Sequence, residues 1–310
     1  MKKNIYLITG VAGFIGSHIA EELLKDSGNE VIGIDNFYSG YTTNLDIIDF
    51  KNFYFYKGDI ADEIILGKIF KRHKVEFIFH QAAVSSVQKS INNPLLSNKV
   101  NVRGTLTLLQ FAKMYKVKRF VFASSAAIYG DEPTLPKSER SKIQPISPYG
   151  YEKLMSEQYL KLYFNLFRVE TIALRYFNVY GPRQDPSSEY SGVISIFEDK
   201  FSKNECPLIF GDGENYRDFI HVKDIVKVNI CAMHSPYNTI VSEICCGTGA
   251  KNTINDIFNV FCKKYNKDWF PIYKGSREGD IVGSISDNSI MISLIDNHQI
   301  IDFAEGVLSL

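Results

Sequence analysis

Short apolar runs alternate with stretches of helical periodicity along the first half of the chain. The apolar runs have the length of β-strands and lie at residues 5–8, 31–34, 53–56, 77–80, 120–123 and 169–174. After the first run, apolar Ile19, Ala20, Leu23 and Leu24 recur at the spacing of an amphipathic helix. Strands that alternate with helices in this way predict an α/β fold with a parallel, doubly wound sheet.

Two further helices are predicted from their first residues. Pro94 is expected to open a long helix that continues to Tyr115 and carries an apolar face. Ser147 has the character of an N-cap and Pro148 that of a first helical residue, so another helix is expected to begin there. After residue 174 the helical and strand patterns are shorter and mixed, which is typical of a smaller mixed α/β lobe.

A glycine-rich segment joins the first predicted strand to the first helix. Gly10 permits a tight turn, Gly13 lets the backbone approach a pyrophosphate, and Gly16 lets the helix pack on the strand. The free N–H groups and the positive dipole end of the helix then face the anion. The spacing is G-x-x-G-x-x-G, and in this strand–turn–helix context it predicts a Rossmann dinucleotide-binding site.

Acidic residues at two strand ends bear on the cofactor. Asp35 ends the second strand, nineteen residues after Gly16, where it can accept hydrogen bonds from the adenosine ribose hydroxyls. A carboxylate there would repel a 2′-phosphate, which favours NAD over NADP. Asp59, followed by Ile60, either contacts the adenine ring or caps the next helix, and the sequence favours neither.

These patterns divide the chain into two parts. We expect residues 1–174 to form mainly the NAD-binding Rossmann domain and residues 175–310 mainly a substrate-binding lobe. The segments are expected to interleave, with residues 222–246 returning to the first domain.

Composition excludes several other classes of protein. The 310 residues include 35 Lys and Arg against 35 Asp and Glu, so general attraction to nucleic acid or to an anionic membrane is not expected. No apolar run reaches transmembrane length. The five cysteines have no C-x-x-C spacing, which predicts free thiols in the cytoplasm rather than disulfides or a metal site.

The predicted helix at Pro148 carries candidate chemistry. Tyr149 and Lys153 are four residues apart and so lie on one face of its first two turns. The ammonium and the helix N-terminus are both expected to favour the phenolate form of Tyr149. A Tyr-x-x-x-Lys pair alone is weak evidence, but Ser125 at the end of an upstream strand strengthens it. Tyr151 is out of register with Lys153 and is expected to pack.

Together these features resemble the extended short-chain dehydrogenase/reductase family, in particular its nucleotide-sugar epimerase branch. The resemblance covers nearly the whole chain and rests on residues 10–16, 59–60, 80–83, 101–105, 124–130, 149–153, 175–184, 211–213, 217–219 and 277–280. It implies an NAD that stays bound, with contacts from Gly10, Gly13, Phe14, Ile15, Gly16, Asp35, Asn36, Asp59, Ile60, Gln81, Ala82, Ala83, Tyr149, Lys153 and Tyr176.

The resemblance also implies the chemistry. Tyr149 takes the proton of the sugar 4-hydroxyl while hydride leaves C4, Ser125 hydrogen-bonds the same oxygen, and Lys153 holds the nicotinamide ribose. Dehydratases and decarboxylases of this family carry acidic residues directly after the catalytic Ser or Thr, because they need extra acid–base groups. Ala126 and Ala127 stand there in this chain, which points to simple 4-epimerisation.

Substrate contacts are likewise implied by the resemblance. Asn178 is expected to contact phosphate or sugar, Arg217 and Arg277 the diphosphate of UDP, and Asp280 the uridine ribose. Small Ser284 stands where epimerases restricted to plain hexoses have a bulky aromatic residue. It predicts activity on UDP-GlcNAc and UDP-GalNAc besides UDP-Glc and UDP-Gal. Further expected substrate contacts are Ser85, Ser86, Ser125, Gln184, Gly192 and Val193.

Three other readings stay open at this point. The chain could be an epimerase of another nucleotide sugar, or a 4-ketoreductase that consumes NADPH. It could also be a non-catalytic NAD sensor, since fold does not fix function. The resemblance further implies a homodimer formed through the helices that begin at Pro94 and Pro148.

Overall fold

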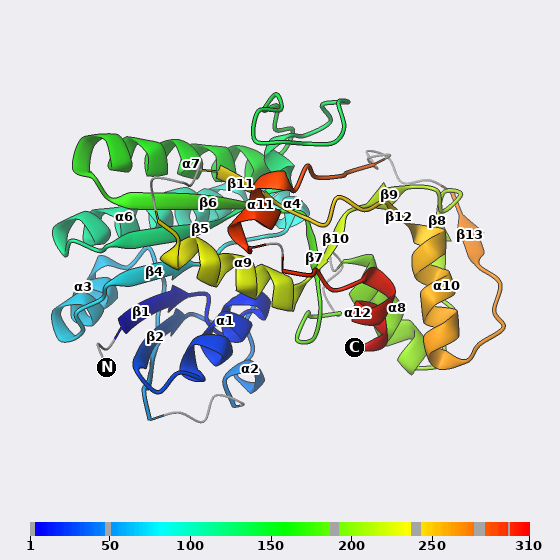
Figure 1. Cartoon of the computed structure of the whole chain (residues 1–310), viewed down its shortest axis with the longest axis horizontal. Helices are drawn as coiled ribbons and strands as arrows, with labels where there is room; N and C mark the ends of the chain where they lie inside the picture. Colours follow the sequence, from blue (N-terminus) through cyan, green and yellow to red (C-terminus); the bar gives the residue numbers. More distant parts are fainter. Residues whose placement is uncertain (1–3, 47–50, 187–191, 237–242, 276–282, 297) are drawn as a thin grey trace. The chain divides into compact units, whose positions relative to one another are not determined.

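The computed structural model describes residues 4–46, 51–186, 192–236, 243–275, 283–296 and 298–310 (Figure 1). Its main element is a seven-stranded sheet with the strand order β11-β6-β5-β4-β1-β2-β3. The strands are β1 (Asn4–Thr9), β2 (Asn29–Asp35), β3 (Phe53–Lys57), β4 (Phe77–His80), β5 (Arg119–Ser125), β6 (Glu170–Tyr176) and β11 (Glu243–Cys246). The predicted doubly wound sheet is therefore confirmed, and β11 adds a seventh strand that the sequence reading did not assign to it.

The direction of winding reverses between β1 and β4, which pair in parallel. In such sheets ligands bind beyond the carboxyl ends of the strands at this reversal. The register brings Thr9 opposite Ile34 on one side and His80 on the other. The segments that follow these three residues, which carry the predicted cofactor contacts, therefore leave the sheet at the same edge.

Helices cover the sheet, and their apolar faces form its core. They are α1 (Phe14–Leu24), α2 (Thr43–Asp46), α3 (Glu63–Arg72), α4 (Val87–Asn92), α5 (Pro94–Asn98), α6 (Thr105–Met114), α7 (Pro148–Phe167) and α9 (Val222–His234). Leu7, Ile32, Ile78 and Phe120 of the strands pack with Leu66 and other helical side chains in one buried cluster. No helix of the described residues is long and apolar enough to cross a membrane.

The helix predicted from Pro94 to Tyr115 is not α-helical throughout. Between α5 and α6 the backbone of residues Lys99–Gly104 (η1) is a π-helix. The Thr105 and Ser156 hydroxyls both donate to the carbonyl of Asn101, at 2.7 and 2.9 Å. Side-chain hydroxyls that donate hydrogen bonds to backbone carbonyls compete with the regular hydrogen bonds of an α-helix. The periodicity of the sequence does not reveal this competition. π-Helical turns are frequent at functional sites.

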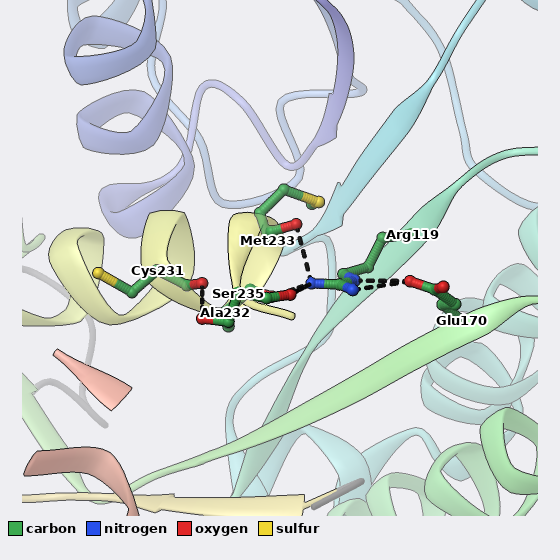
Figure 2. A network of polar contacts seen from close by, with 6 residues as sticks. All are labelled: Arg119, Glu170, Cys231, Ala232, Met233 and Ser235. Atoms are coloured by element: carbon green, nitrogen blue, oxygen red, sulfur yellow. Dashed lines mark hydrogen bonds and ion pairs between the residues drawn. The ribbon is translucent and has the colours of Figure 1, made fainter. Parts of the chain in front are cut away.

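At the amino-terminal ends of the strands, away from the edge where the cofactor segments leave the sheet, Arg119 fixes the end of α9 to the strands (Figure 2). Its Nε and Nη2 donate to Glu170 at 3.0 and 2.7 Å, joining the first residues of β5 and β6. Its Nη1 donates to the carbonyls of Ala232, Met233 and Ser235 at 3.0, 3.1 and 2.6 Å. A cation here meets the carbonyl groups that the last turn of a helix leaves without intrahelical partners.

The chain forms two compact units: one of residues 1–132, 142–175 and 226–244, and the other of 133–141, 176–225 and 245–310. Among its described residues the second unit holds three strand pairs, β7 (Asn178–Tyr180) with β10 (Phe219–His221), β9 (Tyr216–Arg217) with β12 (Asn252–Thr253), and β8 (Leu208–Phe210) with β13 (Ile272–Lys274). Its helices are α8 (Val193–Ser202), α10 (Ile254–Tyr265), α11 (Ser289–Leu294) and α12 (Phe303–Leu308).

Aromatic side chains dominate the core of the second unit. Phe197 and Phe201 of α8 interleave with Phe258 and Phe261 of α10, with ring centroids 5.4–6.3 Å apart. Trp269 also packs in this cluster. Its neighbour Phe270 is 87% exposed.

Candidate active site

The glycine turn after β1 has the geometry that the sequence predicts. Gly10 has φ +69°, and its amide donates to the carbonyl of Ile34 at 2.9 Å. A Cβ on Gly10 would lie 2.8 Å from the Cα of Ala82, and one on Gly16 only 2.2 Å from the carbonyl oxygen of Gly10. Any side chain at these two positions would therefore collide with backbone.

The first turn of α1 fits an anionic group. Its N-cap is Gly13, which offers no side-chain hydrogen bond, and Phe14 and Ile15 begin the helix. The amide groups of such a turn have no intrahelical acceptors and attract phosphate oxygens. The uncapped turn and the glycines that allow close approach therefore fit the pyrophosphate of a dinucleotide.

Asp35 lies beside this turn. Its Oδ2 accepts a hydrogen bond from the amide of Ala12 at 3.0 Å, and its Oδ1 one from the amide of Phe37 at 2.7 Å. Burial raises the pKa of the Asp35 carboxyl, while these backbone hydrogen bonds oppose the rise. The carboxyl group thus fixes the glycine turn to the end of β2. Exposed Asn36 follows it and accepts from the amide of Tyr38 at 3.0 Å.

The structure decides one role for Asp59. The N-cap of α3 is Asp62, which accepts from the amide of Ile64 at 2.8 Å, so Asp59 is not the cap. Asp59 instead accepts from the amide of Ala61 at 2.8 Å. The side chain of Ile60 is buried in the core of the first unit, so a cofactor contact there would have to use its backbone.

The segment after β4 is held by backbone bonds to β1. The amides of Gln81 and Ala82 donate to the carbonyl and hydroxyl of Thr9, each at 3.2 Å. Small Ala82 and Ala83 are half-buried on this segment. His80 just before it is fully buried between the hydroxyls of Thr9 and Thr105, at 2.7 and 2.8 Å. Burial lowers the pKa of His80 to about 3, which agrees with a structural residue.

Ser125, Tyr149 and Lys153 come together at the carboxyl end of β5. Ser147 is the N-cap of α7 and accepts from the amide of Gly150 at 3.1 Å, with Pro148 as the first helical residue. The Lys153 Nζ donates to the carbonyl of Ala123 at 2.6 Å and lies 5.7 Å from the centroid of the Tyr149 ring. The Ser125 side chain acts on Tyr149 and lowers its pKa, and the Ser125 hydroxyl accepts from the amide of Ala127 at 3.2 Å. Tyr151 is half exposed and takes no part.

The protein's own groups alone do not lower the pKa of Tyr149. Burial raises the pKa of Tyr149 to about 12, although the hydrogen bond with Ser125 lowers it. Burial also lowers the pKa of Lys153 to about 7, so the ammonium is only partly populated at neutral pH. The cost of burying both groups thus opposes the attraction of the ammonium and the helix N-terminus for the phenolate.

Sequence reasoning missed a buried ion pair behind this cluster. Glu157 accepts from the Nε and Nη2 of Arg175, at 3.0 and 2.8 Å, and from the Ser124 hydroxyl at 2.5 Å. The Arg175 Nη1 donates to the Tyr129 hydroxyl at 3.0 Å. Glu157 follows Lys153 by four residues and therefore shares its helix face, which is the signal that could have identified it.

The remaining predicted substrate residues lie in two places. Ser86 is the N-cap of α4 in the first unit and follows exposed Ser85. The others belong to the second unit, where Gly192 is the N-cap of α8 and Val193 its first residue. Gln184 donates to the carbonyl of Val179 at 3.2 Å. Arg277 and Asp280 lie outside the described residues, and Tyr176, a predicted cofactor contact, is buried at the end of β6.

Asp218, which sequence reasoning also missed, organises the residues around it. Its carbonyl accepts from the amide and the side chain of Asn178, each at 3.1 Å. Its carboxylate accepts five hydrogen bonds of 2.6–3.0 Å from Thr248, Gly249 and Ser286. Ser284 lies two residues before Ser286, and its amide donates to the carbonyl of Tyr216 at 3.3 Å. Asp218 therefore ties together the segments that carry Asn178, Arg217 and Ser284.

A model of the NAD dependent epimerase/dehydratase family matches residues 6–245. The chain belongs to this family. Members of the NAD-dependent epimerase/dehydratase family are enzymes, and the cofactor is NAD, as Asp35 predicts. The putative UDP-glucose 4-epimerase of Methanocaldococcus jannaschii is 42% identical over 277 residues, which are 89% of this chain and 87% of that protein.

Two solved structures of family members are similar over nearly their whole length. The UDP-glucose 4-epimerase of Thermotoga maritima, with UDP-glucose, is 37% identical with a TM-score of 0.92 over 98% of this chain and 96% of that one. The UDP-N-acetylglucosamine 4-epimerase of Methanobrevibacter ruminantium, in complex with UDP-N-acetylmuramic acid, is 37% identical with a TM-score of 0.91 over 100% and 97%.

Proposed function

We propose that the chain catalyses 4-epimerisation of a UDP-hexose, interconverting UDP-GlcNAc and UDP-GalNAc and also UDP-Glc and UDP-Gal. The observation that carries the reaction type is the cluster of Ser125, Tyr149 and Lys153, in which one phenol is the proton-transferring group. The residues after Ser125 are Ala126 and Ala127, which cannot move protons. The cluster therefore has one acid–base group for one hydroxyl, which suits epimerisation and not the removal of water.

In the proposed reaction Tyr149 takes the proton of the sugar 4-hydroxyl. Ser125 donates a hydrogen bond to the same oxygen and holds it beside the phenol. NAD held at the glycine turn and by Lys153 would supply the hydride acceptor for C4 and, once the 4-keto sugar has turned, the hydride donor for its opposite face. Tyr149 then gives its proton back to the oxygen, so the sugar leaves with the same atoms and an inverted C4.

Lys153 has two proposed tasks. Its Nζ reaches the carbonyl end of β5, from which an ammonium can also donate to the nicotinamide ribose. A positive charge there lowers the cost of forming the Tyr149 phenolate. Because the protein's own groups raise the Tyr149 pKa to about 12, proton removal requires this charge and a further positive charge beside the phenol. Oxidised nicotinamide has such a charge.

The proposed substrate preference rests on Ser284. This half-buried residue follows Gly283, whose position would place a Cβ only 2.1 Å from the ring of Tyr216. Gly283 therefore lies directly against the Tyr216 ring, and the small Ser284 beside it suits a substrate with a 2-acetamido group. The two solved structures, one named for UDP-glucose and one for UDP-N-acetylglucosamine, are each 37% identical to this chain, so Ser284 carries this part of the proposal.

We also propose a homodimer formed through α5 and α7. Leu95 of α5 is 84% exposed, and Tyr151, Met155, Leu162 and Leu166 form one exposed apolar stripe along α7. These residues recur at helical spacing on the face of α7 opposite Lys153. A contiguous apolar stripe of this kind is typical of a protein interface.

The substrate range is tested by incubating the purified chain with UDP-GlcNAc and UDP-Glc separately and following the anomeric proton signals by NMR. We expect both sugars to give their 4-epimers. Turnover of UDP-Glc alone would reject the acetamido preference. Turnover of neither sugar, with a 4-keto sugar reduced at the expense of NADPH instead, would establish the 4-ketoreductase.

A further inference from the structure

Asp218 has a fully buried carboxylate in the second unit that the proposed reaction does not use. Its Oδ1 accepts from the amide and the hydroxyl of Thr248, at 2.7 and 2.8 Å. Its Oδ2 accepts from the amide of Gly249 at 3.0 Å and from the amide and the hydroxyl of Ser286, at 2.9 and 2.6 Å. Because a buried carboxylate is costly without hydrogen bonds, the two segments that supply these donors are held to it.

The loop that follows β11 packs closely against this carboxylate. A Cβ on Gly247 would lie 2.5 Å from the Oδ2 of Asp218 and 2.5 Å from the Oγ of Ser286. Neither distance leaves room for a carbon atom, so Gly247 cannot carry a side chain here. The missing side chain lets the carboxylate, the loop and Ser286 meet at one point.

The segment that contains Ser284 is attached on both sides of Arg217. The Ser284 amide donates to the carbonyl of Tyr216 at 3.3 Å, one residue before Arg217. Ser286 bonds the carboxylate of Asp218, one residue after Arg217, through both its amide and its hydroxyl. These two attachments fix the backbone of Ser284 relative to the backbone of Arg217.

This separation matters for a nucleotide sugar because the sugar has a fixed geometry at the same place. Arg217 is half-buried, and its guanidinium group suits the phosphate oxygens that we expect it to bind. In UDP-GlcNAc the acetamido group is on C2, which is bonded to the carbon that carries the diphosphate. A residue that holds the diphosphate and a residue that leaves space for the acetamido group must therefore keep a constant separation.

We propose that Asp218 is a positioning residue for substrate selection. Its carboxylate holds Ser284 at a fixed place relative to Arg217, so that the diphosphate and the 2-acetamido group are accommodated together. The inference rests on the proposed function, in which Ser284 admits the acetamido group. Asp218 acts through these residues and does not itself transfer a proton, because its carboxylate is buried among its five donors.

The test measures nucleotide binding by titration calorimetry in the Tyr149→Phe holoenzyme, in which the sugars should not turn over. Asp218→Asn is added to this protein, and it replaces one carboxylate oxygen by an NH2 group that cannot accept a hydrogen bond. We expect the Kd for UDP-GlcNAc to rise at least about 10-fold, and those for UDP-Glc and for UDP about 3-fold or less. Equal rises for the three ligands, or no rise for any, would overturn the inference.

Ser286→Ala and Thr248→Val form a matched pair that covers the case in which Asp218→Asn does not fold. Each removes one hydroxyl that donates to the Asp218 carboxylate, but only Ser286 belongs to the segment of Ser284. Ser286→Ala should raise the ratio of the Kd for UDP-GlcNAc to the Kd for UDP about 3-fold, and Thr248→Val should leave this ratio almost unchanged. A ratio that responds equally to both changes, or to neither, would overturn the inference.

A general loss of stability in the second unit is controlled by Phe258→Leu. Phe258 packs against Phe197 and Phe201 in the aromatic core, so the change should lower the urea unfolding midpoint without altering the ratio of Kd values. A change of that ratio as large as the one in Asp218→Asn would show that Asp218 has only a structural role. A wild type that has the expected binding pattern but epimerises neither sugar would reject the proposed function alone, whereas an active wild type with equal Kd rises would reject the inference alone.

Discussion

The Glu157 carboxylate and the Arg175 guanidinium form a two-point ion pair inside the first unit, at 3.0 and 2.8 Å, with both side chains almost completely buried. The Ser124 hydroxyl donates to Glu157, and Arg175 donates to the Tyr129 hydroxyl, so the pair is hydrogen-bonded to a residue on either side of Ser125 in the chain. It thereby joins the strand that ends at Ser125 to the helix that carries Tyr149 and Lys153.

Removing one charge of this pair should be strongly destabilising. In Glu157→Gln the Arg175 cation stays buried without a counter-charge, and we expect the free energy of unfolding to fall by about 3–5 kcal/mol. The measurement is the urea unfolding midpoint. Glu205→Gln breaks the exposed Lys200–Glu205 pair and should leave the unfolding midpoint almost unchanged, because water and salt screen exposed pairs. Equal effects of the two changes would contradict the argument.

Tyr149→Phe should abolish turnover without unfolding the protein. The ring packs as before, but no group remains to take the proton of the 4-hydroxyl, so we expect kcat to fall by a factor of about 1,000 or more. The change is measured as kcat for UDP-GlcNAc at pH 8, with bound NAD quantified in the same sample. Tyr151→Phe is the control on the same helix and should retain full activity. A Tyr149→Phe variant with a tenth of the wild-type rate would rule out Tyr149 as the base.

Lys153 should make stability depend on pH in a defined window. Its pKa falls from 10.5 in the unfolded chain to about 7 in the folded one, so the unfolded chain binds more protons between these values. The contribution of Lys153 to the free energy of unfolding is therefore fully present above pH 10.5 and is lost as the pH falls to about 7. The free energy of unfolding changes by up to about 1.4 kcal/mol per pH unit in this window.

This dependence is measured as the difference in unfolding free energy between wild type and Lys153→Met at several pH values from 7 to 10. We expect the unfolding free energy of wild type to increase relative to that of the variant as the pH rises. Lys71→Met, at an exposed lysine of α3, controls for the loss of a lysine in general. A difference that is constant over this range would contradict the depressed pKa.

Ser284→Tyr should remove acetamido turnover before plain hexose turnover. A tyrosine ring at position 284 would occupy the space that we propose for the acetamido group, so we expect kcat/KM for UDP-GlcNAc to fall at least about 10-fold more than that for UDP-Glc. Ser284→Ala keeps the space and should preserve the ratio of the two values. An equal loss for both sugars would show that this position does not select the 2-substituent.

Leu162→Glu should dissociate the proposed dimer. A carboxylate in the middle of the apolar stripe on α7 would be buried without a partner in the interface. Light scattering after size-exclusion chromatography should give twice the chain mass for wild type and the single chain mass for the variant. Ile64→Glu, at a 72% exposed residue of α3, is the matched control and should stay dimeric. A monomeric wild type would reject the proposal.

Sequence periodicity and residue spacing were sufficient to predict the parts of the fold that depend on residues close together in the chain. The glycine turn, the N-cap Ser147 and the placement of Ser125, Tyr149 and Lys153 follow from spacing and from the end at which strands finish. Contacts between distant segments were not accessible in this way. The carbonyl of Asn101 in the π-helix accepts from the Ser156 hydroxyl, 55 residues away along the chain, and the pKa of Tyr149 depends on burial that no single segment reveals.

The most direct test of the central claim is proton NMR of the purified chain with UDP-GlcNAc in D2O and no added NAD. The account predicts that UDP-GalNAc appears and keeps its hydrogen at C4, because the hydride taken by retained NAD returns to the same carbon. Product that carries deuterium at C4 would contradict hydride return, and absence of product even after NAD is added would contradict the proposed reaction.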